Sequence, residues 1–319
     1  MKGLQTAAIF VTGIVLSAAM GGLAFFLPAL ATATSISGQA VAIPSPAAVA
    51  ARAATPAPSV GGPFTVLLLG SDNDEKFDPN VVLTQSMILV RVDPAAKQVT
   101  MLSIPRDLWV PLSAGGTAKI DAAYAYGGAA AAIATVQKNF GVHVDDYVWV
   151  GLKGLIKLID ALGGVDVVAS NPVLDDYYPQ DINSSNPYGY QRVAVLPGPQ
   201  HLDGTTALQY VRSRHGDLQG DFGRSQRQQQ VLLAIRAKAS QMTIADIPDL
   251  ASAFNGELKT SMSVERVRQL LPIAGQVRPD SIHQIVLLSP YTSLDTIDEQ
   301  SVVVPHWNLI LPLVRKYFP

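Results

Sequence analysis

The sequence contains no cysteine and few charged residues. Its 319 residues include 23 lysines and arginines, 25 aspartates and glutamates, and five histidines. The absence of cysteine excludes disulfide bonds, thiolate metal sites and a cysteine nucleophile. The histidines are scattered without the spacing of metal ligands, and we expect His143 and His215 at the surface or in loops. A formal net charge of −2 is not that of a general nucleic-acid binder, so no nucleic-acid partner is expected.

Charge is missing above all from the amino-terminal region, where no charged residue lies between Lys2 and Arg52. Residues 6–33 are almost wholly apolar, and a helix of roughly 20 such residues crosses the hydrocarbon core of a membrane. We therefore expect a short cytoplasmic tail and a transmembrane signal anchor in residues 1–34. A cleaved signal peptide is the alternative, because Leu30-Ala-Thr-Ala33 resembles a small-residue cleavage site. Either segment places the rest of the chain outside the cytoplasm, and the anchor would hold it at the cell membrane.

Beyond the apolar segment, residues 35–63 are rich in Ala, Ser, Pro, Thr and Gly, which is typical of a flexible linker. Residues 64–319 alternate apolar runs typical of strands with helical patterns, and a polar loop is expected at 171–190. This alternation predicts a single three-layer α/β/α domain with a central mixed sheet. Strands are expected at 64–69, 86–92, 98–104, 147–150, 165–169 and 282–288, and helices at 119–140, 152–162, 200–212, 224–240, 264–277 and 307–318.

Four arginines lie close together: Arg212, Arg214, Arg224 and Arg227. Guanidinium groups bind phosphate oxygens in pairs, which lysine does not do. A solvated basic face is the alternative interpretation.

The arginine-rich segment also has a helical pattern. If a helix begins near Asp221, steps of four, three and four place Arg224, Gln228, Val231 and Ile235 on one face. The apolar end of this face must be buried, so Arg224 and Gln228 are expected where it opens into a cleft.

Three further segments carry polar groups just after expected strands or at an expected helix start. They are Leu69-Gly-Ser-Asp72, Ser103-Ile-Pro-Arg-Asp107 and Lys119-Ile-Asp-Ala-Ala-Tyr124. Ligand-binding groups of α/β folds commonly follow strands in this way. Taken singly, an aspartate after a strand also suits a turn or cap, and an Arg–Asp pair also suits a structural ion pair.

Together and in this order, the motifs resemble the LytR–CpsA–Psr family of cell-wall glycopolymer transferases. The resemblance covers residues 64–240. The matching segments are Leu67-Leu-Leu-Gly-Ser-Asp72, Val99-Thr-Met-Leu-Ser-Ile-Pro-Arg-Asp107, Lys119-Ile-Asp-Ala-Ala-Tyr-Ala-Tyr-Gly-Gly128, Ile159-Asp-Ala-Leu-Gly-Gly-Val-Asp166, Gly198-Pro-Gln-His-Leu-Asp-Gly204, Ala207-Leu-Gln-Tyr-Val-Arg-Ser-Arg214 and Asp221-Phe-Gly-Arg-Ser-Gln-Arg-Gln-Gln229.

The resemblance implies an enzyme that transfers a glycopolymer from polyprenyl pyrophosphate to peptidoglycan through a phosphodiester and releases polyprenyl phosphate. It implies Mg²⁺ as cofactor, with Asp72 as its ligand, and an apolar channel for the prenyl chain, which residues 122–134 and 152–162 are expected to line. Asp72, Arg106 and Arg224 would be catalytic. Substrate would be bound by Arg106, Lys119, Arg212, Arg214, Arg224, Arg227 and Gln228, with Arg227 at the rim.

The chain departs from the family pattern at two positions near Asp72. Asp74 stands where an arginine is usual, and Leu83-Thr-Gln-Ser-Met87 replaces Arg-Ser-Asp-Thr-Met. Gln85 therefore occupies the position of a second metal-binding carboxylate, and its uncharged carbonyl would bind Mg²⁺ more weakly. Asp74 or Asp78 is the alternative ligand. A binding or regulatory protein for lipid-linked wall intermediates is the alternative function, and a pyrophosphatase that needs no acceptor is a third.

Overall fold

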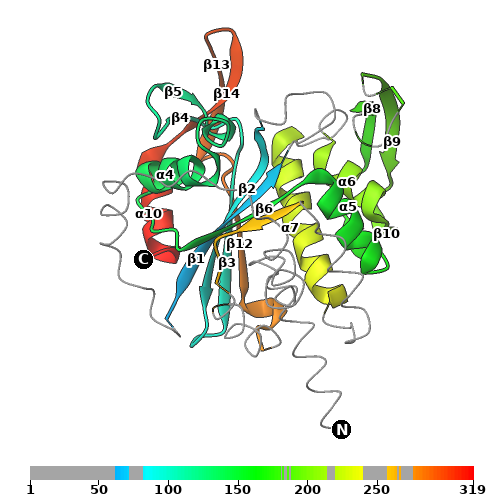
Figure 1. Ribbon diagram of the computed structural model, residues 1–319, viewed down its shortest axis with the longest axis horizontal. Helices are drawn as coiled ribbons and strands as arrows, with labels where there is room; N and C mark the ends of the chain where they lie inside the picture. Colours follow the sequence, from blue (N-terminus) through cyan, green and yellow to red (C-terminus); the bar gives the residue numbers. More distant parts are fainter. Residues whose placement is uncertain are drawn as a thin grey trace, which may run out of the picture.

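The computed structural model describes residues 62–71, 82–180, 182, 185–186, 188–213, 220–239, 257–263, 266 and 276–319 (Figure 1). The predicted anchor, nearly all of the linker and most of the predicted helix at 264–277 lie outside the described residues. Asp72, Asp74, Asp78 and Arg214 lie outside them as well. Within the described part of the chain, no helix has both the length and the apolar composition needed to cross a membrane.

A six-stranded mixed sheet forms the centre of the molecule (Figure 1). Three consecutive strands pair antiparallel, and the outer strands add both parallel and antiparallel neighbours. Across the sheet the order is β11 (Leu258–Thr260), β6 (Asp146–Val150), β1 (Phe64–Ser71), β2 (Thr84–Asp93), β3 (Gln98–Ile104) and β12 (Ile282–Val286).

Strand β1 is buried on both faces, as its continuous apolar run predicts. Leu67 and Leu69 contribute to the core on one face of the sheet. Val66 and Leu68 contribute to the core on the other face, because successive side chains of a strand point to opposite sides. The sheet therefore needs a covering layer on each face.

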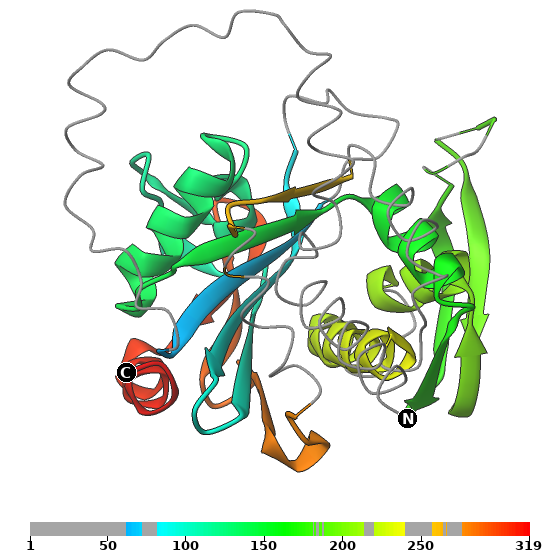
Figure 2. The same ribbon diagram turned by 60° about the horizontal axis from the view of Figure 1, so that its bottom comes forward.

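The first covering layer contains the helices α4 (Gly128–Phe140) and α10 (Trp307–Tyr317), the latter drawn in red in Figure 2. The rings of Phe140 and Trp307 meet edge to face, with centroids 5.3 Å apart. Smaller elements on this side are β4 (Trp109–Pro111), β5 (Thr117–Lys119), the 3-10 helix η1 (Ile120–Ala123) and the hairpin of β13 (Thr292–Ile297) and β14 (Gln300–Pro305).

The second covering layer is built around the 20-residue helix α7 (Gly220–Ala239), drawn in yellow. Figure 2 shows α7 between the sheet and an outer group of elements. Val231 and Ile235 belong to the core shared with that outer group, whereas Leu232 and Leu233 pack towards the sheet. The outer group comprises α5 (Leu152–Ala161), β7 (Val165–Ala169), β8 (Val173–Pro179), β9 (Tyr190–Val195), β10 (Gly198–Leu202) and α6 (Gly204–Arg212).

The α/β fold with a central mixed sheet is confirmed, but several local predictions are wrong. The segment 171–190 contains strand β8 and leads into β9, with which β8 pairs antiparallel. The helix predicted at 200–212 begins only at Gly204, because residues 200–202 pair with β7. Asp203 caps that helix by accepting a hydrogen bond from the backbone nitrogen of Thr206, at 2.7 Å. The short 3-10 helix η3 (Pro279–Ser281) precedes β12.

Candidate functional site

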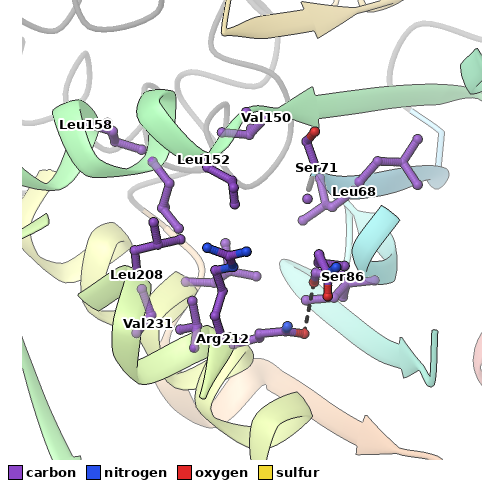
Figure 3. Close-up of a pocket in the computed structure, with 18 of the residues that line it drawn as sticks. Leu68, Ser71, Ser86, Val150, Leu152, Leu158, Leu208, Arg212 and Val231 are labelled. Atoms are coloured by element: carbon purple, nitrogen blue, oxygen red, sulfur yellow. Dashed lines mark hydrogen bonds between the residues drawn. The ribbon is translucent and has the colours of Figure 1, made fainter. Parts of the chain in front are cut away.

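A pocket lies between the sheet and the helices of the second layer (Figure 3). It encloses about 930 Å³ of empty space, part of which is open to solvent. In Figure 3, Leu68 and Ser86 on the sheet face Leu208 and Val231 on the helices. The pocket is therefore a space between two layers of the fold, and helices α5, α6 and α7 form its outer wall.

Most of the pocket wall is apolar. Leu152, Leu155 and Leu158 project from α5, at steps of three residues that keep them on one side of the helix. Leu68 and Ile88 complete the wall from strands β1 and β2. An apolar cavity of this kind suits a hydrocarbon chain, because the pocket wall and the chain both lose contact with water on binding.

Only one of the two segments expected to line an apolar channel does so. Residues 152–162 contribute three leucines to the wall. The alanine-rich segment 122–134 lies on the other face of the sheet, where Ala132 is buried against the core of the first layer. Its placement follows from the connection to β4 and β5, a feature that alanine content does not reveal.

The predicted face of α7 is confirmed. Arg224, Gln228, Val231 and Ile235 all line the pocket, with the two polar residues nearer the amino-terminal end of the helix. Arg224 is buried, with 4% of its surface exposed. The shared face follows from the helical repeat of 3.6 residues.

Arg212 brings a second guanidinium to the same pocket from the end of α6. Its Nη1 donates to the hydroxyl oxygen of Tyr178 at 3.5 Å, and its Cζ lies 5.7 Å from the centre of that ring. The described residues that line the pocket include no aspartate or glutamate. Arg212 and Arg224 therefore make its polar end positive and suited to an anion.

Strand β2 contributes two consecutive residues, Gln85 and Ser86, to the pocket wall. Neighbours in a regular strand point to opposite faces, but the pairing of β1 and β2 is irregular here. Gly70 pairs with Ser86 and Ser71 pairs with Thr84, so Gln85 is the extra residue of a β-bulge. Bulges redirect side chains in this way and are frequent beside functional sites.

The close approach of β1 to the bulge explains Gly70. A Cβ atom at this position would lie 3.0 Å from the Cβ of Ser86, which is tighter than ordinary contacts. Ser86 in turn donates a hydrogen bond from its Oγ to Oε1 of Gln228, at 2.9 Å. This bond connects the sheet to α7 across the polar end of the pocket, and Ser86 is a site residue that the sequence analysis did not identify.

A series of charged side chains leads from Lys119 through Asp107 to Arg106, which contacts the pocket wall. Lys119 Nζ lies 3.0 Å from Oδ1 of Asp107, and Arg106 Nε lies 3.3 Å from Oδ2 of the same carboxylate. Arg106 Nη1 donates to the side-chain oxygen of Gln85, which lines the pocket. Asp107 is buried, and these two cations compensate the charge of its carboxylate. Neither Arg106 nor Lys119 lines the pocket, and their direct contact with substrate stays a prediction.

Arg227 was predicted at the rim of the site, but it lies elsewhere. Its Nε and Nη2 donate to the backbone carbonyls of Tyr210 and Ser213, both at 2.6 Å, and its Cζ lies 5.5 Å from the centre of the Tyr210 ring. Burial lowers the pKa of Arg227 to about 10, because the charged form loses its hydration. It borders a smaller polar pocket with Asn171 and Gln226. These contacts are those of a residue that joins α6 to α7.

Among the described residues, no group of three or more His, Cys, Asp or Glu side chains is arranged to hold a metal ion. The oxygen of Gln85, its only possible metal-binding atom, accepts a hydrogen bond from a guanidinium. Asp72 lies outside the described residues, and its role as a metal ligand stays a prediction.

Comparison with known proteins agrees with this geometry. Residues 32–308 match the LytR_cpsA_psr family. Biofilm regulatory protein A of Streptococcus mutans is 34% identical over 215 residues, which are 63% of this chain and 50% of that protein. The polyisoprenyl-teichoic acid–peptidoglycan teichoic acid transferase TagU of Enterococcus faecalis is 29% identical over 246 residues, 75% of this chain and 76% of TagU. The chain thus spans half the length of the first relative.

Solved structures show the same fold. The crystal structure of TagV from Bacillus subtilis superposes with a TM-score of 0.65 and 28% identity, over 81% of this chain and 96% of TagV. The structure of TagT bound to LI-WTA gives a TM-score of 0.62 and 26% identity, over 80% of this chain and 89% of TagT. Since the family match extends over most of the sequence and the fold agrees, the chain belongs to the LytR_cpsA_psr family.

Proposed function

We propose that the protein is a phosphotransferase. It attaches a glycopolymer carried on polyprenyl pyrophosphate to peptidoglycan through a phosphodiester, and it releases polyprenyl phosphate. The main support is the pocket itself, which is apolar over most of its wall and carries Arg212 and Arg224 at its polar end. The name of the E. faecalis relative supports the same reaction.

The two ends of the pocket suit the two parts of such a donor. The leucines of α5 and the apolar face of α7 cover the hydrocarbon chain. Arg212 and Arg224 bind the pyrophosphate oxygens, and each guanidinium offers several N–H donors in a fixed plane. An amphipathic donor of this shape lies with its lipid between the two layers of the fold and its glycan outside.

The proposed reaction is one phosphoryl transfer. A sugar hydroxyl of peptidoglycan attacks the phosphorus atom that carries the glycan, and a new O–P bond forms. The bond from that phosphorus to the bridging oxygen breaks, so polyprenyl phosphate leaves and the hydroxyl gives up its proton. Arg212 and Arg224 stabilise negative charge on the transferred and leaving phosphate oxygens. The expected Mg²⁺ rests on Asp72, and removal of the ion by a chelator tests it.

We further propose that the folded domain lies outside the cytoplasm on a membrane anchor, as residues 1–34 indicate. This position lets the domain meet a donor held in the membrane and an acceptor in the wall. Protease added to intact spheroplasts is expected to degrade the domain. A domain that survives until the membrane is permeabilised would contradict the proposal.

The transfer is tested with the full-length protein, a lipid-pyrophosphate oligosaccharide, peptidoglycan fragments and Mg²⁺, with and without EDTA. Mass spectrometry is expected to find an acceptor that has gained the oligosaccharide and one phosphate. The second candidate is a binding or regulatory protein for lipid-linked wall intermediates. It predicts bound donor and no product.

A further inference from the structure

Gln85 has an amide orientation that follows from its partner. Arg106 carries only hydrogen-bond donors, so the atom of the Gln85 amide that faces Nη1 must be the oxygen. The assignment is thus independent of the usual ambiguity between the oxygen and nitrogen of an amide. The NH₂ group of Gln85 is turned away from the guanidinium.

Arg106 is itself held in place by a buried group. Its Nε lies 3.3 Å from Asp107, and Lys119 binds the other oxygen of that carboxylate at 3.0 Å. Asp107 has 5% of its surface exposed. The contacts from Lys119 through Asp107 to Arg106 therefore hold the side-chain carbonyl of Gln85 in place. The bulge of β2 puts the same side chain in the pocket wall.

This arrangement disfavours a cation at Gln85. Mg²⁺ binds oxygen ligands, and the single side-chain oxygen of Gln85 already accepts from a positively charged donor. A cation at that oxygen would have to displace the guanidinium or lie beside it, and both options cost electrostatic energy. An anion has the opposite preference, since the NH₂ group and the nearby arginines all donate or carry positive charge.

We propose that Gln85 is a pyrophosphate-binding residue that donates its amide N–H groups to a phosphate oxygen, and that it is not a metal ligand. Arg106 is the positioning residue that holds the amide in this orientation. The inference rests on the proposed function, because it names a further contact with the same class of ligand.

The test uses geranyl pyrophosphate as a short soluble ligand and calorimetry on the full-length protein in EDTA. Gln85→Met removes the donor, and we expect a loss of affinity of about tenfold to a hundredfold, as for one hydrogen bond to a charged group. Gln226→Met is the matched control, because Gln226 is an exposed glutamine of α7 outside the main pocket. Its affinity is expected to stay within about twofold of the unmodified protein.

Gln85→Glu gives a second variant that preserves size and an acceptor for Arg106. It replaces the NH₂ group by an anionic oxygen, so we expect a larger loss of affinity in EDTA than for Gln85→Met. Titration of Mg²⁺ alone is expected to give the same affinity for the unmodified protein and Gln85→Met. Circular dichroism confirms that each variant is folded before it is compared.

The outcomes separate the inference from the function on which it rests. Unchanged ligand affinity in Gln85→Glu, or weaker Mg²⁺ binding in Gln85→Met, would show that Gln85 is not the proposed donor. If the unmodified protein binds no geranyl pyrophosphate in either EDTA or Mg²⁺, the proposed function fails instead. Binding that requires Mg²⁺ and is unaffected by Gln85→Met would overturn the inference and leave the function intact.

Discussion

Two arginines of α7, three residues apart, are expected to affect different properties when each is replaced by methionine. Arg227 binds two backbone carbonyls and a tyrosine ring, whereas Arg224 lines the pocket. We therefore expect Arg227→Met to lower the free energy of unfolding without a direct effect on ligand affinity. Arg224→Met is expected to lower affinity for a prenyl pyrophosphate.

The size of the effect at Arg227 follows from opposing contributions. Two hydrogen bonds from a charged donor contribute about 1.5–3 kcal/mol each, and the ring contact adds about 1 kcal/mol. Against this, burial lowers the pKa of Arg227 to about 10, which corresponds to a cost of about 3 kcal/mol for burying the charge. The net loss in Arg227→Met is then about 1–4 kcal/mol. Arg227→Lys retains the charge but not the fork, and it is expected to recover only part of this loss.

Urea unfolding followed by circular dichroism measures the stability, and calorimetry with geranyl pyrophosphate measures the affinity. For Arg224→Met we expect a loss of about 1.5–3 kcal/mol in binding free energy. The reasoning would be refuted if Arg227→Met remained as stable as the unmodified protein while binding ligand more weakly. That result would place Arg227 at the ligand, as the sequence pattern predicts.

Three further predictions concern the cavity wall and helix α6. Leu155→Trp is expected to fill part of the cavity, so that geranyl pyrophosphate binds more weakly while inorganic pyrophosphate is unaffected in calorimetry. Gly204→Ala is expected to destabilise the fold by about 1–3 kcal/mol in urea unfolding, because its Cβ would lie 2.1 Å from the carbonyl oxygen of Ile156. Replacement of the exposed neighbour, Thr205→Ala, serves as the control. Asp203→Ala is expected to cost about 1 kcal/mol at pH 7 by removing the cap of α6, with Asp203→Asn nearly neutral. The hydrogen bond from the backbone of Thr206 lowers the pKa of Asp203 below 3.8. This stabilisation is therefore present above pH 3.8 and is lost as the pH falls through the folded-state pKa. The difference in unfolding free energy between the unmodified protein and Asp203→Ala should therefore disappear in acid.

The parts of the fold that sequence predicts well are those with strong apolar periodicity. Strand β1 is a short continuous apolar run, and such a run fits a strand buried on both faces. The face of α7 that contains Arg224 and Gln228 follows from helical spacing, and the pocket confirms it. In both cases the information is local, so no knowledge of distant contacts is needed.

The parts that sequence does not predict depend on contacts between distant segments. Strands β8 and β9 alternate buried with exposed side chains over part of their length, and the polar composition of the region resembles a loop. The bulge at Gln85 depends on the register of β1 against β2. The different roles of Arg224 and Arg227 depend on which carbonyls α6 presents, since the two arginines are alike in the sequence.

The most direct test of the account is the release of polyprenyl phosphate from a lipid-pyrophosphate oligosaccharide, measured with and without peptidoglycan fragments. The account predicts release only when acceptor is present, one polyprenyl phosphate for each phosphodiester formed, and loss of both products in Arg224→Met. Equal release in the absence of acceptor would identify a pyrophosphatase. Tight binding of donor with no release under either condition would identify a binding protein, and either result would contradict the proposed transfer.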